Sequence, residues 1–145
     1  MVKKISCGNY TFFLGGGNTL DSLKCGKWMY FPRDFTFAEK ICRQAVELNI
    51  VEQAKHSNDG GVCCFYLNID DTAGHKRVIE FFLQNRLIPK TKAGKFHNIP
   101  FKLDLQTRTG QYGEDFIPVL ELADVLEIVF TDKKWYYLNV CEHGF

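Results

Sequence analysis

Polar and apolar residues alternate along the segment 101–108, and the polar ones could together bind an anion. They are Lys102, Asp104, Gln106 and Arg108. If the segment is a β-strand, these side chains project from one face at intervals of about 6–7 Å. Two cations, a carboxylate and an amide in a row can hold a ligand that is negatively charged and forms hydrogen bonds, such as a nucleotide. The alternative is the solvated face of a half-buried strand, which shows the same alternation without any function.

A second polar cluster lies shortly before the glycine pair Gly60-Gly61, at an expected strand end, and consists of Lys55, His56, Ser57 and Asn58. Lysine supplies a positive charge, histidine a donor or an acceptor near neutral pH, and serine a hydroxyl that can orient phosphate oxygens. The same residues are equally consistent with a solvated loop in which the glycines make the turn.

Aromatic residues beside cations form the third candidate. Trp28 follows Lys27 in an expected strand, so its indole could stack on a base while the lysine binds a phosphate. Tyr112 is a second candidate for stacking, and one stacked base contributes roughly 1–3 kcal/mol. The alternative is that tryptophan lies in the core, and it applies to Trp135 as well.

The same residues permit catalysis on a phosphate ester. His56 would be the general acid and Lys55 or Lys102 the base, provided that burial among other cations lowers the pKa of the lysine. The sequence has no G-x-S-x-G nucleophile motif. Its six cysteines and four histidines lack the short spacings of a zinc site. We therefore expect no metal and no cofactor, and reduced thiols in a cytoplasmic protein.

The sequence patterns of the segments that contain these residues predict an α+β fold. Residues 26–31 have strand composition, and a helix with a Thr36-x-x-Glu39 capping box and apolar residues at helical spacing follows over 37–48. The run 62–69 is almost wholly apolar, which predicts a strand buried on both faces at the centre of a sheet. Asp71 or Thr72 caps a second helix that ends before Pro89. Two helices around a central strand predict a sheet with one covered face.

The other segments predict a mainly β second half. Residues 10–14 have strand composition, although the region 1–24 as a whole is hard to assign. The alternating segment 101–108 predicts a strand, and 116–122 and 125–130 are further apolar segments. Pro118 places its segment at a sheet edge. Residues 135–140 after the turn 131–134 predict a C-terminal hairpin.

Composition limits the class of protein and its partners. The chain has 145 residues, of which 46% are hydrophobic and 24% charged, which fits one globular domain over 1–145. A net charge of +1 argues against extended binding to a nucleic-acid backbone, which requires a basic excess. The absence of a signal sequence and of an 18-residue apolar run predicts no contact with a membrane.

Several of these segments resemble a known family, that of the basophilic-leukaemia-expressed and related bacterial proteins labelled phosphothreonine lyase domains. The resemblance covers residues 24–113 and rests on Gly26-Lys27-Trp28, on the A-K-x-S box at 54–57 and on the K-x-D pattern at 102–104. It implies the fold of the messenger-RNA cap-binding translation initiation factor, a curved antiparallel sheet with helices on its convex side. In that fold a positively charged base lies between aromatic rings, and Lys and Arg bind its phosphates.

The leading hypothesis is a non-enzymatic protein that binds a phosphorylated small molecule, in particular a nucleotide or nucleotide-derived signal. The residues predicted to bind the phosphate groups are Lys27, Lys55, Lys102 and Arg108. Those predicted to form hydrogen bonds with the polar edges of the ligand are Ser57, Asp104 and Gln106. Such a protein could sequester its ligand, as some phage-encoded inhibitors of bacterial defence do. The alternatives are a phosphate lyase or phosphoesterase and a protein-interaction module with exposed aromatics such as Trp135 and Tyr136. The oligomeric state is not predicted.

Overall fold

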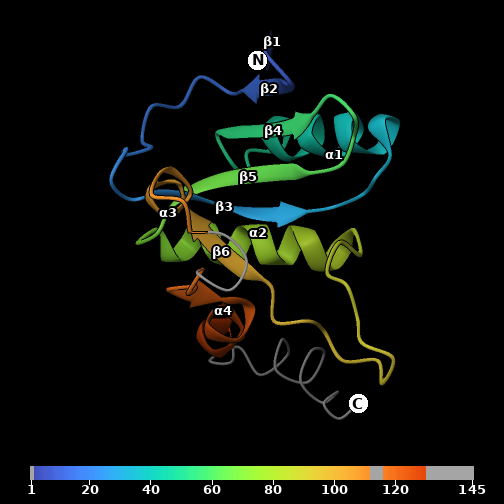
Figure 1. Ribbon diagram of the computed structural model, residues 1–145, viewed down its shortest axis with the longest axis vertical. Coiled ribbons are helices and arrows are strands. Elements are labelled where there is room, and N and C mark those ends of the chain that lie inside the picture. The colour runs from blue at the N-terminus through green and yellow to red at the C-terminus, as the bar shows by residue number, and fades with distance from the viewer. Residues whose placement is uncertain (1, 112–115, 130–145) are drawn as a thin grey trace.

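The computed structural model describes residues 2–111 and 116–129, which form an open antiparallel sheet of seven strands together with four helices (Figure 1). In chain order the elements are β1 (Lys3–Cys7), β2 (Tyr10–Leu14), β3 (Cys25–Tyr30), α1 (Phe35–Glu47), β4 (Gln53–Ser57), β5 (Cys63–Asn68), α2 (Thr72–Gln84), β6 (Pro100–Leu103), α3 (Asp104–Arg108), β7 (Leu120–Glu121) and α4 (Leu122–Val129). The strands lie in the order β1-β2-β4-β5-β3-β6-β7. The predicted α+β class and antiparallel sheet are thereby confirmed.

The central strand of the sheet is β5, as its apolar sequence predicted. Five of its six residues are buried, as expected for an apolar run in the centre of a sheet. Phe65 belongs to the main hydrophobic cluster together with Trp28. Its neighbours Cys64 and Tyr66 belong to a second, smaller cluster with Cys25. The alternation of side chains along β5 therefore separates two faces of the sheet with different surroundings.

The N-cap of the helix α1 lies two residues before the predicted one. Asp34 is the N-cap, and its carboxylate accepts a hydrogen bond from the backbone N–H of Phe37 at 3.1 Å. Thr36 already lies inside the helix, and the Glu39 carboxylate instead pairs with Lys4 Nζ at 2.7 Å. The prediction of the helix is confirmed, but the prediction of the Thr36-Glu39 box is wrong. The helix packs on β2, β4 and β5.

The helix α2 follows the central strand, as predicted. Its N-cap is Asp71, which accepts a hydrogen bond from the backbone N–H of Gly74 at 2.9 Å. Its buried residues include Val78 and Phe82, which belong to the main hydrophobic cluster. The helix also contacts α4.

The prediction of a single strand over 101–108 is wrong. The strand β6 ends at Leu103, and the short helix α3 begins at Asp104. The Gln106 side chain accepts a hydrogen bond from the Leu103 N–H at 3.1 Å, which fixes the first turn of this helix. The Asp104 carboxylate turns back to bind Lys27 Nζ at 2.8 Å. These contacts replace the strand, so the alternating polar residues do not form one row.

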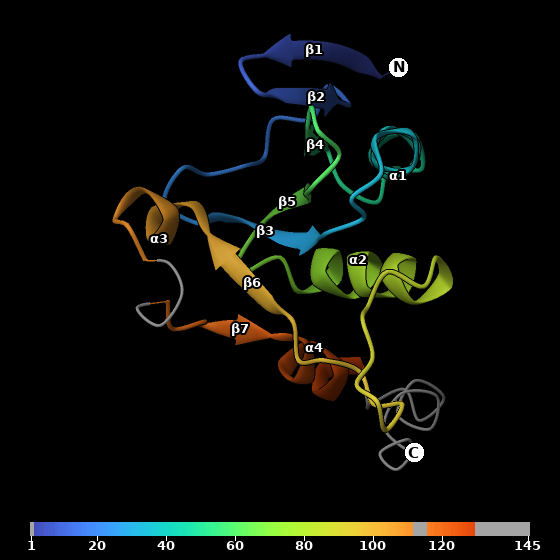
Figure 2. The same cartoon turned by 45° about the vertical axis from the view of Figure 1, so that its right-hand side comes forward.

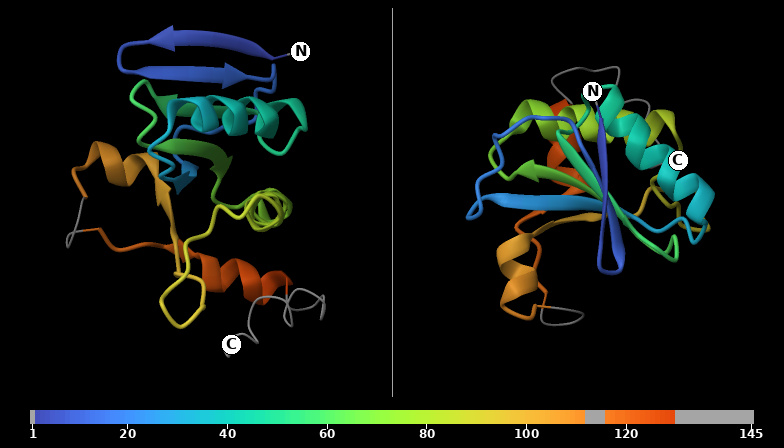
Figure 3. Two further views of the ribbon diagram at one scale, coloured as in Figure 1. Left: turned by 90° about the vertical axis from the view of Figure 1, so that its right-hand side faces the viewer. Right: turned by 90° about the horizontal axis from the view of Figure 1, so that it is seen from above.

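The two edges of the sheet were less predictable than its centre. The strand composition of 10–14 is confirmed as β2, which forms a hairpin with β1, a strand that the sequence did not predict (Figure 3). At the opposite edge lies β7, two residues beyond Pro118. The segment that follows is the helix α4 and not part of a mainly β half. The predicted C-terminal hairpin lies outside the described residues.

The sheet separates α1 from α3, which lie on opposite sides of it (Figure 2). The polar residues of α3 are thus placed over one face of the sheet, and the buried residues of α1 over the other. Within residues 2–111 and 116–129, no helix has the length and apolar character needed to cross a membrane.

Candidate ligand-binding face

Three lysines from three strands lie on one face of the sheet. Lys27 of β3 is directly opposite Tyr66 of β5 on one side and Lys102 of β6 on the other. Lys55 of β4 is directly opposite Cys64 of β5. Because residues directly opposite each other share a face, all three lysines lie on the face of Cys64 and Tyr66, away from the main hydrophobic cluster. We call this surface the lysine face.

Lys55 lies among three aromatic rings of the lysine face. Its Nζ is 4.0 Å from the ring centre of Tyr10, 5.5 Å from that of Phe12 and 5.9 Å from that of Tyr66. The negative face of an aromatic ring attracts an ammonium group but carries no net charge. No carboxylate among the described residues lies within ion-pair distance of Lys55. The rings therefore hold the ammonium group in place without neutralising its positive charge.

Lys27 and Lys102 form the second part of the lysine face, and each is only 8% exposed. Lys27 Nζ binds Asp104 Oδ1 at 2.8 Å and donates a hydrogen bond to Thr107 Oγ1 at 3.0 Å. Lys102 Nζ lies 5.3 Å from the ring centre of Phe116. Burial lowers the pKa of Lys102, and the neighbouring charge of Lys27 lowers it further. A bound anion would stabilise both ammonium groups.

Two cysteines of the lysine face are protonated at neutral pH. Burial, and then the charge of Asp104, raise the pKa of Cys25 to about 12. Burial raises the pKa of Cys64 to about 11, although Lys55 and Lys27 act in the opposite direction. Since the thiolate is the nucleophilic form of cysteine, these two residues are not activated nucleophiles.

Gln106 and Arg108, predicted to contact a ligand, hold the backbone instead. The Gln106 side chain is buried, accepts from the Leu103 N–H and donates to the Ile117 carbonyl at 2.8 Å. Arg108 Nη2 donates to the carbonyl of Ser22 at 2.8 Å. The two residues fix α3 and its neighbouring loops and do not extend the lysine face.

Trp28 is a core residue, so its interpretation as a stacking platform is wrong. It is 0% exposed and packs against Phe101 on the face opposite the lysines. Its Nε1 donates to His75 Nδ1 at 3.0 Å, and His75 Nε2 donates to the Ile69 carbonyl at 2.8 Å. Both nitrogens of His75 are satisfied in the neutral form, and burial lowers the pKa of this histidine.

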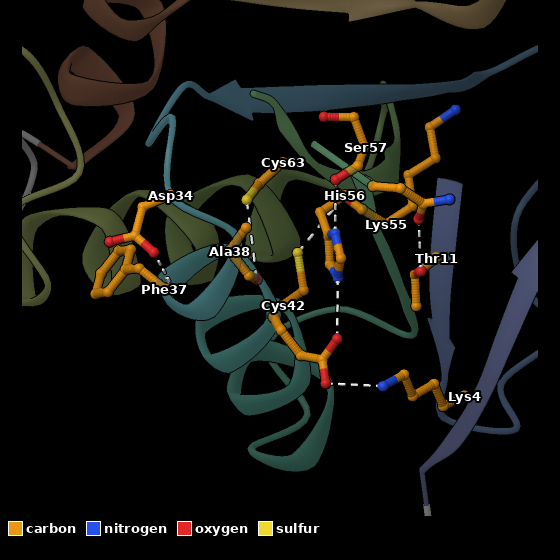
Figure 4. Close-up of polar contacts among 12 residues, drawn as sticks. Lys4, Thr11, Asp34, Phe37, Ala38, Cys42, Lys55, His56, Ser57 and Cys63 are labelled. Carbon is orange, nitrogen blue, oxygen red and sulfur yellow. Dashed lines mark hydrogen bonds and ion pairs between the residues drawn. The ribbon is translucent and has the colours of Figure 1, made fainter. Parts of the chain in front are cut away.

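His56 also points away from the lysine face. Its imidazole is 0% exposed and lies beside α1, near Cys42 (Figure 4). Its Nδ1 lies 2.9 Å from the carbonyl of Ser57, and its Nε2 lies 3.5 Å from Glu39 Oε1. The proposed acid His56 and the proposed bases Lys55 and Lys102 are therefore separated by the sheet. The described residues also contain no group of three side chains arranged to bind a metal ion.

Ser57 has a structural role in the turn between β4 and β5. Its Oγ donates to Asp59 Oδ1 at 2.6 Å and accepts from the Val62 N–H at 3.0 Å. The remaining predicted residue, Tyr112, lies outside the described residues.

The aromatic part of the site was not predicted from the sequence. Tyr10 and Phe12 lie on a strand next to that of Lys55, and Phe12 is directly opposite Lys55. Tyr66 was assigned to a buried strand without a role. The alternation of Tyr10 and Phe12 along β2 was the available signal, but only the pairing of β2 with β4 brings them to Lys55. Comparison of the chain with protein-family models, curated proteins and solved structures gives no match.

Proposed function

We propose that this protein binds a small phosphorylated ligand, in particular a nucleotide or nucleotide-derived signal, on the lysine face. The observation that carries the proposal is the presence of three lysines on one face of the sheet, two of them on adjacent strands, with Lys55 held among aromatic rings. A phosphorylated ligand with an aromatic base combines the two chemistries that this face offers, negative charge and a flat π-surface.

The lysines and the aromatic rings have different roles in the proposed binding. Lys55 and Lys102 contact the phosphate groups, and Lys27 contributes its charge while Asp104 and Thr107 hold its position. Tyr10 and Phe12 are half-buried and can stack on a base. Tyr66 is only 5% exposed, so its role is to attract the ammonium group of Lys55. Of the three residues predicted to bind the polar edges of the ligand, Asp104 is the one that we still expect to accept a hydrogen bond from it.

The proposed activity is binding without chemical change. The phosphate lyase or phosphoesterase alternative requires an acid beside its base, and His56 lies across the sheet from both candidate lysines. The thiols of Cys25 and Cys64 are protonated at neutral pH. A cytoplasmic protein of this kind would act by sequestering its ligand.

The proposal includes a finer arrangement of the fold, in which α1 and α2 cover one face of a curved sheet and leave the lysine face to the ligand. Residues of both helices share the main hydrophobic cluster with Trp28 and Phe65, which supports this arrangement. It is also the arrangement implied by the resemblance to the cap-binding fold.

Isothermal titration calorimetry with mono-, di- and cyclic nucleotides and nucleotide sugars tests the proposal. We expect one of these classes to bind, and the substitution Lys55→Ala to weaken its binding about tenfold or more, as expected for loss of a charge-assisted contact. Lys40→Ala, which removes an exposed lysine of α1, is the matched control and should leave the affinity unchanged. Absence of heat with every compound would refute the proposal.

Mass spectrometry of the recovered ligand separates binding from catalysis. After prolonged incubation with the protein, we expect the bound nucleotide to be recovered unchanged. Formation of a product at a rate that depends on protein concentration would favour the enzyme instead.

A further inference from the structure

A cavity of about 420 Å³ lies beside the end of β3 and the beginning of β6. Its lining is mainly apolar and includes Met29, Leu87, Ile99 and Phe116. Binding sites for small molecules are typically concave, mainly apolar and about 300–1,000 Å³ in volume, with a few polar groups that orient the ligand. The cavity has the size and lining of such a site.

Two cations also line this cavity, Lys102 from β6 and Arg86 from the end of α2. They come from different elements of the fold, and both lie at one apolar space. Lys102 is 8% exposed, so the charge of its ammonium group is only weakly screened by solvent. The described part of the chain contributes no acidic side chain to the lining. The cavity therefore combines an apolar interior with two cationic side chains in its lining.

The backbone at Arg86 gives independent support for a role of its side chain. The end of α2 is a Schellman motif, in which the Arg86 N–H donates to the Leu83 carbonyl and the Leu87 N–H to the Phe82 carbonyl. Arg86 occupies the left-handed position of this motif, with φ of 58°. Glycine is the usual residue at that position because a side chain there is strained. At Arg86 this strained position carries a guanidinium group at the lining of the cavity.

We propose that this cavity binds an amphipathic anion, a molecule with an apolar or aromatic body and one carboxylate or phosphate group. The body fills the space between Met29, Leu87, Ile99 and Phe116, and the acidic group binds Arg86 and Lys102. This site goes beyond the proposed nucleotide site and shares only Lys102 with it.

Calorimetric titrations with octanoate, octyl phosphate and 1-octanol test the proposal. We expect the two anions to bind at least tenfold more tightly than the alcohol, because only they can pair with the cations. The better of the two anions identifies the acidic group. Equal affinities for all three compounds, or no binding of either anion, would overturn the proposal.

The substitution Arg86→Gly tests the guanidinium group without destabilising the fold, because glycine relieves the strain at this position. We expect unfolding in urea to require the same or a higher concentration, while the affinity for both anions falls about tenfold. Arg33→Gly is the matched control, since Arg33 also has a positive φ, 53°, but does not line the cavity. Unchanged anion affinity in Arg86→Gly, or an equal loss in Arg33→Gly, would contradict the assignment.

Two further substitutions separate this proposal from the nucleotide site. Ile99→Phe fills part of the cavity and should abolish octanoate and octyl phosphate binding while preserving any nucleotide binding that Lys55 supports. Lys55→Ala should have the reverse effect. If Ile99→Phe leaves binding of the anions unchanged, they do not occupy the cavity and the proposal fails, whatever the result with nucleotides.

Discussion

Lys27 and Lys102 lie directly opposite each other on adjacent antiparallel strands, and each is only 8% exposed. Like charges in this relationship repel each other, and burial increases the cost because water is excluded. Asp104 and Thr107 stabilise the Lys27 side of the pair. A bound anion would offset the repulsion between these two ammonium groups, which is the central claim of the proposed function.

The substitution Asp104→Asn tests the support of Lys27. It removes the carboxylate from a nearly buried ammonium group, so we expect the free energy of unfolding to fall by about 1–2 kcal/mol, less than for a fully buried pair because Asp104 itself is one-third exposed. Urea denaturation measures this change.

The exposed pair Lys24–Asp70 provides the control for Asp104→Asn. Its two side chains are 52% and 59% exposed at the same separation of 2.8 Å, so Asp70→Asn should produce no measurable change in stability. Equal effects of the two substitutions would show that burial of the Lys27–Asp104 pair has no consequence.

Trp28→Phe and Tyr10→Leu distinguish the core from the binding face. Trp28→Phe removes the hydrogen bond to His75 and leaves space in the core, so we expect a loss of about 1–3 kcal/mol in stability. The affinity of the folded protein for a nucleotide should remain unchanged. Tyr10→Leu should preserve stability and weaken nucleotide binding. Urea denaturation and calorimetry on both variants check the pair, and a loss of affinity confined to Trp28→Phe would restore the stacking role of Trp28.

Two glycines with similar backbone conformation differ in the space around them. Gly60 has φ of 75°, and a Cβ atom there would overlap the backbone nitrogen of Phe35. Gly110 has φ of 79° and no atom within 4 Å of that position. We expect Gly60→Ala to destabilise the protein by about 3 kcal/mol or more, and Gly110→Ala by about 1–2 kcal/mol from backbone strain alone. Thermal unfolding of the two variants measures the difference, and similar values would mean that the chain near Phe35 moves freely.

The stability of the protein should depend on the ionisation of His75. Burial lowers the pKa of His75 below its ordinary value of 6.5, so the unfolded chain binds more protons between the two pKa values. The contribution of neutral His75 is therefore present above pH 6.5 and is lost as the pH falls below it. We expect the free energy of unfolding to decrease from pH 7 to pH 5, and to decrease less in His75→Gln, which cannot be protonated. Urea denaturation at several pH values in this range measures the change. An equal decrease in the free energy of unfolding for both proteins would contradict the prediction.

The features predicted correctly from the sequence depend on local patterns. The apolar run that became β5 has no polar residue to expose, so its place in the centre of the sheet follows from its composition. The helix α2 was predicted because Asp71 precedes a regular apolar stripe and Pro89 follows it. The three lysines of the candidate site were also named in advance, although in three separate clusters.

The errors occurred where distant contacts override local patterns. The alternation at 101–108 is compatible with a strand, but Asp104 binds Lys27, 77 positions earlier in the chain, and the backbone turns into α3. The three lysines of the lysine face lie on different strands and not along one of them. The spacing of residues within a single segment therefore cannot predict this face. His56 follows Lys55 directly, and their side chains point to opposite faces because both residues lie within the strand β4. The sequence predicted a strand end followed by a loop here, which leaves these orientations open.

The central claim is tested most directly by a ¹H–¹⁵N NMR titration of the uniformly labelled protein with ADP and with inorganic pyrophosphate. If the lysine face binds phosphate, the backbone signals of Lys27, Lys55 and Lys102 and their neighbours in β3, β4 and β6 will shift with increasing concentration of either compound. The additional shifts caused by ADP will include Tyr10 and Phe12. No concentration-dependent shifts with either compound, or shifts confined to α1, would contradict the proposed binding face.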